Sequence, residues 1–339
     1  MDAQLLDEAA LAEAAAIIQR GGLVAFPTET VYGLGANALD STAVAKIFAA
    51  KERPSYDPLI VHVASADQLP QLTTHVPPIA QTLAAMFWPG ALTLVLPKSA
   101  IVPDIVTAGG PTVAVRCPSH PLALALIRQA GTPIAAPSAN RFSHTSPTTA
   151  QHVWDDLAGR IDLILDGGST PIGVESTVLD VTGDVPVVLR PGGVAVEALR
   201  AVVDVVVPQK QMKKGTDMLA SPGMLDKHYA PKAALWLFTG ENWLARMQSE
   251  LAAELANGRL PALLLAEEDL GAFMQFDVPK FVMPSAADLT AVARSLYASL
   301  RAADQPGTQL IFARDFPPEG LGLAIRDRLR RAAVRTIGD

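Results

Sequence analysis

The sequence predicts an α/β protein in two parts: a twisted, mixed β-sheet with flanking helices, then a smaller Rossmann-like parallel α/β domain. The chain has 339 residues, which exceeds the ~250–300 residues at which single cores stop growing. Before residue 207, strand-like and helix-like segments are mixed without strict alternation, which is typical of a mixed sheet. Over 233–339 they alternate regularly, which favours parallel strands joined by crossover helices.

The first part begins with a helix over 8–20, which the pair Gly21-Gly22 ends as a C-cap signal. An apolar strand follows at 23–26. A second helix is predicted over 41–51, with Asp40 or Ser41 as its N-cap. The remaining predicted helices lie near 77–87 and 120–129, and the remaining strands at 58–63, 92–96, 112–116, 133–136, 161–165, 175–181 and 186–189.

Residues 207–232 lose all periodicity and are rich in Pro, Gly and Lys, so they are predicted to form a linker. Because long loops are often functional, this linker is also a candidate lid. The domains are therefore 1–206, the linker 207–232, and 233–339. In the last domain, strands are predicted at 234–238, 261–265, 279–282 and 308–313, and helices at 242–256, 286–303 and 319–333.

Composition limits the classes of function. The net charge of −7 argues against a protein that grips a long stretch of nucleic acid, which usually has a basic surplus. The longest apolar runs, such as Leu122 to Ile127, are far shorter than the ~18 residues of a membrane helix. The acidic start lacks the basic region of a signal peptide, so we expect a soluble, cytosolic protein. The lone Cys117 is expected to be a buried bystander.

Polar residues crowd the ends of several apolar strands, where α/β proteins commonly bind ligands. In FPTETVYGLG, residues 26–35, the strand is predicted to end in a polar turn that Gly33 and Gly35 close. The turn holds Thr28, Glu29, Thr30 and Tyr32. Locally, a ligand site and an ordinary polar turn are both consistent with this pattern.

Cationic residues also lie at the ends of predicted helices and strands. Lys51 and Arg53 end the helix over 41–51, where they would either complement the helix dipole or clamp a phosphate. Arg116 ends an apolar strand and must find an anion or stay exposed. His62 lies within PLIVHV, which by itself indicates a satisfied core histidine.

Two further stretches carry hydroxyl and amide groups. The loop of PIAAPSANRFSHTSP, residues 133–147, contains Ser138, Asn140, Ser143 and Ser146, which could wrap phosphate or ribose oxygens. In GVESTVLD and VPVVLRPG, Ser176 precedes one strand and Arg190 ends the next. The chain has no GxxxxGK[ST] loop, HExxH metal motif or GxSxG nucleophile elbow. The residue types therefore favour positioning of a nucleotide over covalent catalysis.

Taken in order, these stretches resemble the YrdC-like threonylcarbamoyl-AMP synthase family in its long, two-domain form. Over roughly residues 8–200 the resemblance rests on FPTETVYGLG, KERP, PLIVHV, FWPGALTLVL, AVRCPSHP, APSAN and ESTVLD. The family's KxR and SxN signatures stand here as Lys51-Glu52-Arg53 and Ser138-Ala139-Asn140. In the linker and tail, SPGMLDKHYAP and EGLGLAIRDRLRRAA are similar to segments of the longer members.

The resemblance implies a YrdC-like first domain and an ATP-dependent synthesis of threonylcarbamoyl-AMP from L-threonine and bicarbonate, with Mg²⁺ on the ATP and no metal site of the protein. It places Lys51 and Arg53 in catalysis. It assigns L-threonine to Thr30, His62, Arg116, Ala136 and Ser176. It assigns ATP to Lys51, Arg53, Asp57, Thr112, Ser138, Asn140, Ser146, Arg190 and, from the linker, His228 or Tyr229.

The resemblance also implies a downstream partner, an enzyme that transfers the threonylcarbamoyl group to tRNA, with tRNA contact by this chain weak or indirect. Three other readings stay open from the residues alone. They are a nucleic-acid-binding module, a different carbamoyl-transfer enzyme that contains a YrdC-like domain, and a nucleotide sensor without turnover.

Overall fold

A computed structural model describes residues 7–208 and 229–338. The chain divides into two compact units, each described by itself below: Met1–Phe142 with Ser146–Asp226, and Ser143–Thr145 with Lys227–Asp339. Within the described residues, no helix is both long and apolar enough to cross a membrane.

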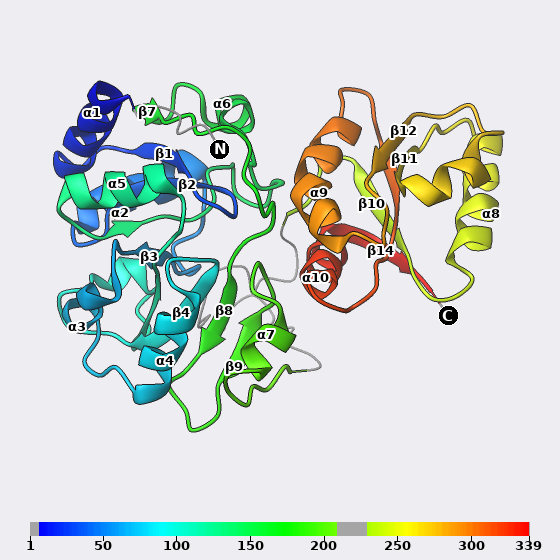
Figure 1. Cartoon of the computed structure of the whole chain (residues 1–339). Helices are drawn as coiled ribbons and strands as arrows, with labels where there is room; N and C mark the ends of the chain where they lie inside the picture. The colour runs from blue at the N-terminus through cyan, green and yellow to red at the C-terminus, as the bar shows by residue number, and fades with distance from the viewer. Residues whose placement is uncertain (1–6, 209–228, 339) are drawn as a thin grey trace. The chain divides into compact units, whose positions relative to one another are not determined.

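A nine-stranded sheet forms the frame of the first unit (Figure 1), in the order β7-β1-β2-β6-β3-β5-β4-β8-β9. It is mixed, as predicted, because β3 pairs with β5 in parallel while β4 pairs with β5 in antiparallel fashion. The strands are β1 (Val24–Pro27), β2 (Tyr32–Asn37), β3 (Ile60–His62), β4 (Leu92–Pro97), β5 (Thr112–Arg116), β6 (Ile134–Ala135), β7 (Leu163–Ile164), β8 (Thr177–Asp180) and β9 (Val187–Arg190).

Helices flank this sheet. Those over residues 8–19, 41–51, 78–87 and 121–130 lie where they are predicted, whereas those over 69–72, 150–157 and 196–200 are not predicted. Asp40 caps the second helix by accepting hydrogen bonds from the N–H groups of Thr42 and Ala43. The first helix and α5 pack together over β1, in a core that includes Ile17, Phe26 and Leu126. The helices are α1 (Glu8–Gln19), α2 (Ser41–Lys51), α3 (Leu69–Leu72), α4 (Pro78–Phe87), α5 (Pro121–Ala130), α6 (Ala150–Leu157) and α7 (Val196–Arg200), with short 3-10 turns at Ala66–Gln68 and Asp104–Val106.

The region predicted as a polar turn is different in the structure. Only residues 28–31 turn, and β2 then runs antiparallel to β1 with Gly33 opposite Phe26. The two glycines of this stretch serve close packing in a strand. A Cβ on Gly35 would lie 2.8 Å from atoms of Phe26 and Ile134, closer than real contacts allow.

The second unit contains a five-stranded sheet in the order β12-β11-β13-β10-β14. All of its strand pairs are parallel, as the regular alternation predicts. Its elements are β10 (Ala234–Phe238), α8 (Trp243–Ala256), β11 (Ala262–Ala266), a 3-10 segment (Glu267–Phe273), β12 (Lys280–Met283), α9 (Leu289–Ala303), β13 (Leu310–Arg314), α10 (Gly322–Ala332) and β14 (Ala333–Ile337). The last of these strands was not predicted.

Candidate functional site

The end of β5 brings one group of predicted residues together. Arg116 closes this strand and is almost fully buried. Its Nη1 donates to Thr30 Oγ1 at 2.9 Å, its Nε donates to the carbonyl of Gly90 at 3.2 Å, and its Nη2 forms an ion pair with Glu29 at 2.6 Å. The β1–β2 turn and the end of β5 are thus joined by contacts between residues 86 and 87 positions apart.

His62 lies directly beside Arg116, because β3 and β5 pair in parallel register with these two residues opposite each other. Burial, reinforced by the Arg116 charge, lowers the pKa of His62 to about 3, so its imidazole is neutral near pH 7. Within the described residues, His62 Nδ1 is buried and has no hydrogen-bond partner. A buried polar atom in this condition is available to a ligand.

A second group forms where α2 ends. The Lys51 ammonium is buried and donates to the backbone carbonyls of Ser138, at 2.6 Å, and of Asn140. Burial, followed by the neighbouring Arg53 charge, lowers the pKa of Lys51 well below its usual value. In this state Lys51 therefore holds the loop that carries Ser138 and Asn140.

Arg53 and Asp57 form a buried ion pair at 2.9 Å just before β3. Arg53 Nη2 also donates to the carbonyl of Pro58 at 2.8 Å. Burial raises the pKa of Asp57, against the opposing charges of Arg53, Lys51 and Arg190. These three cations belong to α2, to the loop before β3 and to β9, so the three segments come together around Asp57.

Ser176, at the entry to β8, is the centre of a third group. Its Oγ lies 2.7 Å from Thr93 Oγ1, and its carbonyl accepts from Arg190 Nη2 at 2.9 Å. Glu175, the residue before Ser176, accepts a hydrogen bond at its Oε1 from Ser146 Oγ at 2.6 Å. All five of these side chains are buried.

An apolar cluster lies between these groups on one face of the sheet. Side chains alternate along a strand, so Thr112, Ala114 and Arg116 share a face of β5, and the register adds His62 from β3 to it. Ala114 belongs to a buried cluster with Ile60, Val95, Val178 and Leu189, against which Phe142 packs. Thr112 and Arg116 thus stand at opposite ends of an apolar floor. The predicted residues extend across the sheet face as well as along strand ends.

The other predicted residues are placed as follows. The N–H of Ala136 donates to the carbonyl of Ile60 at 2.9 Å, so a ligand contact there would use the Ala136 carbonyl. His228 lies outside the described residues. Tyr229 is buried in the second unit, where its ring stacks on Tyr297 and Arg328 lies 5.0 Å from its centroid. Its contact with ATP stays a prediction, as do the other assigned contacts.

Sequence reasoning missed the roles of three buried side chains. Glu29 pairs with Arg116, Thr93 bonds to Ser176, and Glu175 bonds to Ser146. Glu29 belongs to the FPTETVYGLG stretch, but its partner is 87 residues away. No local pattern could identify that pairing.

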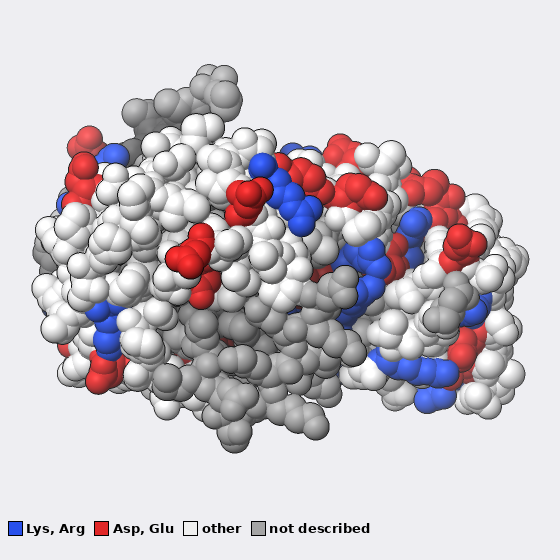
Figure 2. Space-filling model, turned by 90° about the horizontal axis from the view of Figure 1, so that it is seen from below, with Lys and Arg blue, Asp and Glu red and all other residues white. Residues whose placement is uncertain are grey.

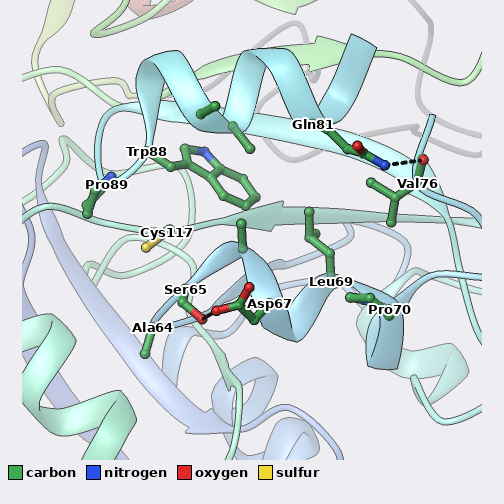
Figure 3. Close-up of a pocket in the computed structure, with 13 residues that line it drawn as sticks. Ala64, Ser65, Asp67, Leu69, Pro70, Val76, Gln81, Trp88, Pro89 and Cys117 are labelled. Carbon is green, nitrogen blue, oxygen red and sulfur yellow. Dashed lines mark hydrogen bonds between the residues drawn. The ribbon is translucent and has the colours of Figure 1, made fainter. Parts of the chain in front are cut away.

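A groove of about 610 Å³ opens beside the Arg116 end of the sheet (Figure 3). Its wall includes Ala64, Trp88, Pro89 and Cys117, with Asp67 and Gln81 among its polar residues. None of the predicted site residues lines it. Cys117 is buried, as predicted, and burial followed by the Glu29 charge raises the pKa of its thiol to about 11.

Charged side chains on the surface do not form a single-signed region on the face in Figure 2, where described Lys, Arg, Asp and Glu side chains are interspersed. Among the described residues, no group of three or more His, Cys, Asp or Glu side chains could hold a metal ion.

Two family models match the chain. The Sua5/YciO/YrdC model, described as "Telomere recombination", matches residues 16–192. A second model, described as the C-terminal domain of threonylcarbamoyl-AMP synthase, matches residues 194–334. Together the two models span both parts of the chain.

Relatives match over nearly the whole length. Threonylcarbamoyl-AMP synthase of Bacillus subtilis is 49% identical over 95% of this chain and 92% of its own length. The protein of the same name from Pyrococcus abyssi is 45% identical over 94% and 93%. The solved structure of P. abyssi Sua5 complexed with L-threonine has a TM-score of 0.90 and 43% identity, and covers 97% of this chain and 96% of its own. The chain therefore belongs to the Sua5/YciO/YrdC family of threonylcarbamoyl-AMP synthases, in the form that carries the C-terminal domain.

Proposed function

We propose that this protein is an enzyme that makes threonylcarbamoyl-AMP from L-threonine, bicarbonate and ATP, with release of pyrophosphate. The observation that carries the proposal is its similarity, over more than nine-tenths of the chain, to proteins named for this synthesis. A relative with the same fold has been solved with L-threonine bound. The buried cations and hydroxyl groups of the first unit supply the chemistry that these substrates need.

The amino acid would bind at the Arg116 end of the sheet face. Arg116 offers its guanidinium to the threonine carboxylate, because a planar fork suits two carboxylate oxygens. The neutral His62 can accept a hydrogen bond from the amine or the hydroxyl of threonine. Thr30, the Ala136 carbonyl and Ser176 complete the proposed contacts.

The nucleotide would lie across the apolar floor toward Thr112. The cluster around Ala114 and Phe142 offers apolar surface to a base, and the surrounding cations suit the phosphates. The proposed phosphate and ribose contacts are Lys51, Arg53, Asp57, Ser138, Asn140, Ser146 and Arg190. Lys51 would exchange one of its two carbonyl partners for a phosphate oxygen or act by holding the loop.

The reaction proceeds in two steps. The threonine nitrogen attacks the carbon of CO2, formed from bicarbonate, and loses a proton to give an N-carboxylate. An oxygen of this carboxylate attacks the α-phosphorus of ATP, the bond to the β-phosphate oxygen breaks, and pyrophosphate leaves. This is a nucleotidyl transfer between two anions, so cations must offset their repulsion. Holding the reactants together contributes roughly 7–11 kcal/mol, and no nucleophilic side chain is required.

Mg²⁺ would enter as part of the MgATP substrate. This ion keeps several waters and binds mainly through substrate phosphates, with one or two carboxylates. Asp57, which pairs with Arg53, is the one carboxylate among the residues assigned to ATP and would be the protein's ligand to this ion.

The product is an acyl-adenylate, a group poised for transfer to a nucleophile. A second enzyme would move the threonylcarbamoyl group to an adenosine beside the tRNA anticodon. Direct tRNA contact by this chain is not needed for that step, in keeping with its net charge of −7.

Pyrophosphate release tests the proposal. The full chain is incubated with MgATP while L-threonine and bicarbonate are each supplied or omitted. We expect release only when both are present, with threonylcarbamoyl-AMP identified by mass spectrometry. Release that is independent of threonine, or no release under any condition while ATP still binds, would overturn the synthase and favour the nucleotide-sensor reading.

A further inference from the structure

We propose that Glu29 is the positioning residue that orients Arg116 for the carboxylate of the amino-acid substrate. This inference rests on the proposed function, because it concerns how that substrate is held.

The Glu29–Arg116 pair is buried, with 7% and 4% of the two side chains exposed. Removing two charges from water is expensive, and a buried ion pair is often no more stabilising than an apolar pair of the same volume. The burial of the pair therefore does not by itself assign it a role. The contacts of Arg116 and Glu29 indicate that the pair fixes the guanidinium.

The hydrogen bonds of Arg116 leave part of its donor set available. A guanidinium has five N–H donors. Nε, Nη1 and Nη2 each donate once, to the carbonyl of Gly90, to Thr30 Oγ1 and to Glu29 Oε1. One hydrogen on each terminal nitrogen has no acceptor among the described residues. A substrate carboxylate can take both.

Glu29 is itself held from the other side. Its Oε2 accepts from the N–H of Ser119 at 3.0 Å, three residues beyond Arg116, and its carbonyl accepts from the N–H of Ile172 at 2.9 Å. Both carboxylate oxygens are thus in use, one on Arg116 and one on the chain that follows it. Glu29 is therefore held in place and fixes the plane of the Arg116 guanidinium.

The turn that carries Glu29 is internally bonded. Thr28 Oγ1 lies 2.7 Å from Thr30 Oγ1 and donates to the carbonyl of Val31 at 2.7 Å. Thr30, which also accepts from Arg116, thus shares one rigid turn with Glu29. Two of the three acceptors around the guanidinium are therefore set by the same four residues.

The charge balance supports the same role. With Glu29 present, the pair is neutral before substrate arrives, and His62 beside it is neutral too. If the carboxylate is removed, Arg116 is a buried cation whose remaining partners are neutral oxygen atoms of Thr30 and Gly90. It is then expected to rotate toward water or any other anion, and to lose its alignment with the substrate.

The test compares Glu29→Gln, Glu29→Asp and the unaltered chain. L-threonine binding without ATP is measured by calorimetry, and pyrophosphate release gives KM for threonine and for ATP separately. For Glu29→Gln we expect threonine affinity to fall 10- to 100-fold and threonine KM to rise alike, with ATP KM and kcat at saturating threonine within about threefold of the starting values. Glu29→Asp keeps the charge but is too short to span Arg116 and Ser119, so it should be intermediate.

A substrate analogue separates positioning from general damage to the fold. L-threoninamide lacks the carboxylate, so the unaltered chain should bind L-threonine much more tightly than the amide, while Glu29→Gln should lose most of that preference. Asp104→Asn is the matched control, since Asp104 pairs with Lys98 at an exposed loop of the same unit. It should behave as the starting protein.

The outcomes are distinct. The positioning role is overturned if Glu29→Gln keeps the wild-type preference for threonine over its amide, or if its KM values for threonine and for ATP rise equally. Neither result would overturn the proposed function. Absence of threonine binding by the unaltered chain would overturn the proposed function and this inference with it. If Glu29→Gln does not fold, wild-type selectivity in Glu29→Asp would overturn the inference by itself.

Discussion

Two strand-end arginines look the same in the sequence and differ in the structure. TVAVR ends with Arg116 in the first unit, and LIFAR ends with Arg314 in the second. Both form an ion pair with a buried carboxylate, Glu29 at 2.6 Å and Asp269 at 2.9 Å. An apolar strand that ends in arginine therefore predicts an anionic partner, but does not say whether that partner is a ligand.

The surroundings distinguish the two arginines. Arg314 lies 4.6 Å from the ring centroid of Trp243 and 5.4 Å from that of Phe316, and Glu268 adds a second carboxylate at 3.6 Å. Two acids around one cation repel an anionic ligand, and the rings cover the guanidinium. Arg116 has one acid, one hydroxyl and one carbonyl. These surroundings suit a structural role for Arg314 and the binding role that we propose for Arg116.

The largest effect is expected for the substitution of Arg116. Arg116→Ala should weaken L-threonine binding at least 100-fold, about 3 kcal/mol, because it removes the carboxylate partner and leaves Glu29 buried without its cation. Arg314→Ala should leave threonine affinity unchanged and lower the free energy of unfolding by about 2–3 kcal/mol, since Asp269 then loses its charge partner. Calorimetric binding and urea denaturation of both variants measure the two effects. Equal losses of threonine affinity would show that the distinction is wrong.

Lys51 is a buried cation that donates hydrogen bonds to carbonyl groups. Lys51→Ala and Arg53→Ala should each lower kcat about 100-fold while the protein stays folded, because each removes a positive charge near the transferred phosphate. Lys46→Ala is the control for the first. Lys46 lies on the same helix and also donates to a carbonyl, that of Gly21 at 2.6 Å, but outside the site. Initial rates and circular dichroism are the measurements, and near-normal turnover of both site variants would exclude the phosphate clamp.

A smaller effect, on the free energy of unfolding, is expected from His62 as the pH falls. Its folded-state pKa of about 3 lies below the unfolded value of about 6.5, so the unfolded chain binds the proton first as the pH falls. This group therefore costs stability progressively below pH 6.5, by up to about 1.4 kcal/mol per pH unit. Between pH 6.5 and 5.5, unfolding free energies from urea titrations should fall by about 1 kcal/mol more in the wild type than in His62→Gln. Parallel pH profiles would mean that His62 is not held neutral.

Much of the fold could be predicted from local pattern. The cap at Asp40, the glycine pair after the first helix and the alternation over 233–339 each act within a few residues, and each prediction is confirmed. The helices α3, α6 and α7 were not predicted, nor were two strands, of which one is β2. Gly33 and Gly35 indicated a turn, whereas the space beside Phe26 requires glycine in a strand. The other was β14, where Val334, Arg335 and Thr336 are all exposed, so no apolar alternation marks the strand.

The candidate site was predictable only as a set of stretches. The helix and strand periods, the position of Arg116 at the end of an apolar strand, and the ordered motifs that identify the family could be predicted from the sequence, because these depend on neighbours along the chain. Tertiary structure alone decided that Arg116 meets Glu29 and Thr30 while Arg314 meets Asp269 and Trp243. The physical reason is that sheet register joins segments tens of residues apart, and the field around each cation depends on what that register brings to it.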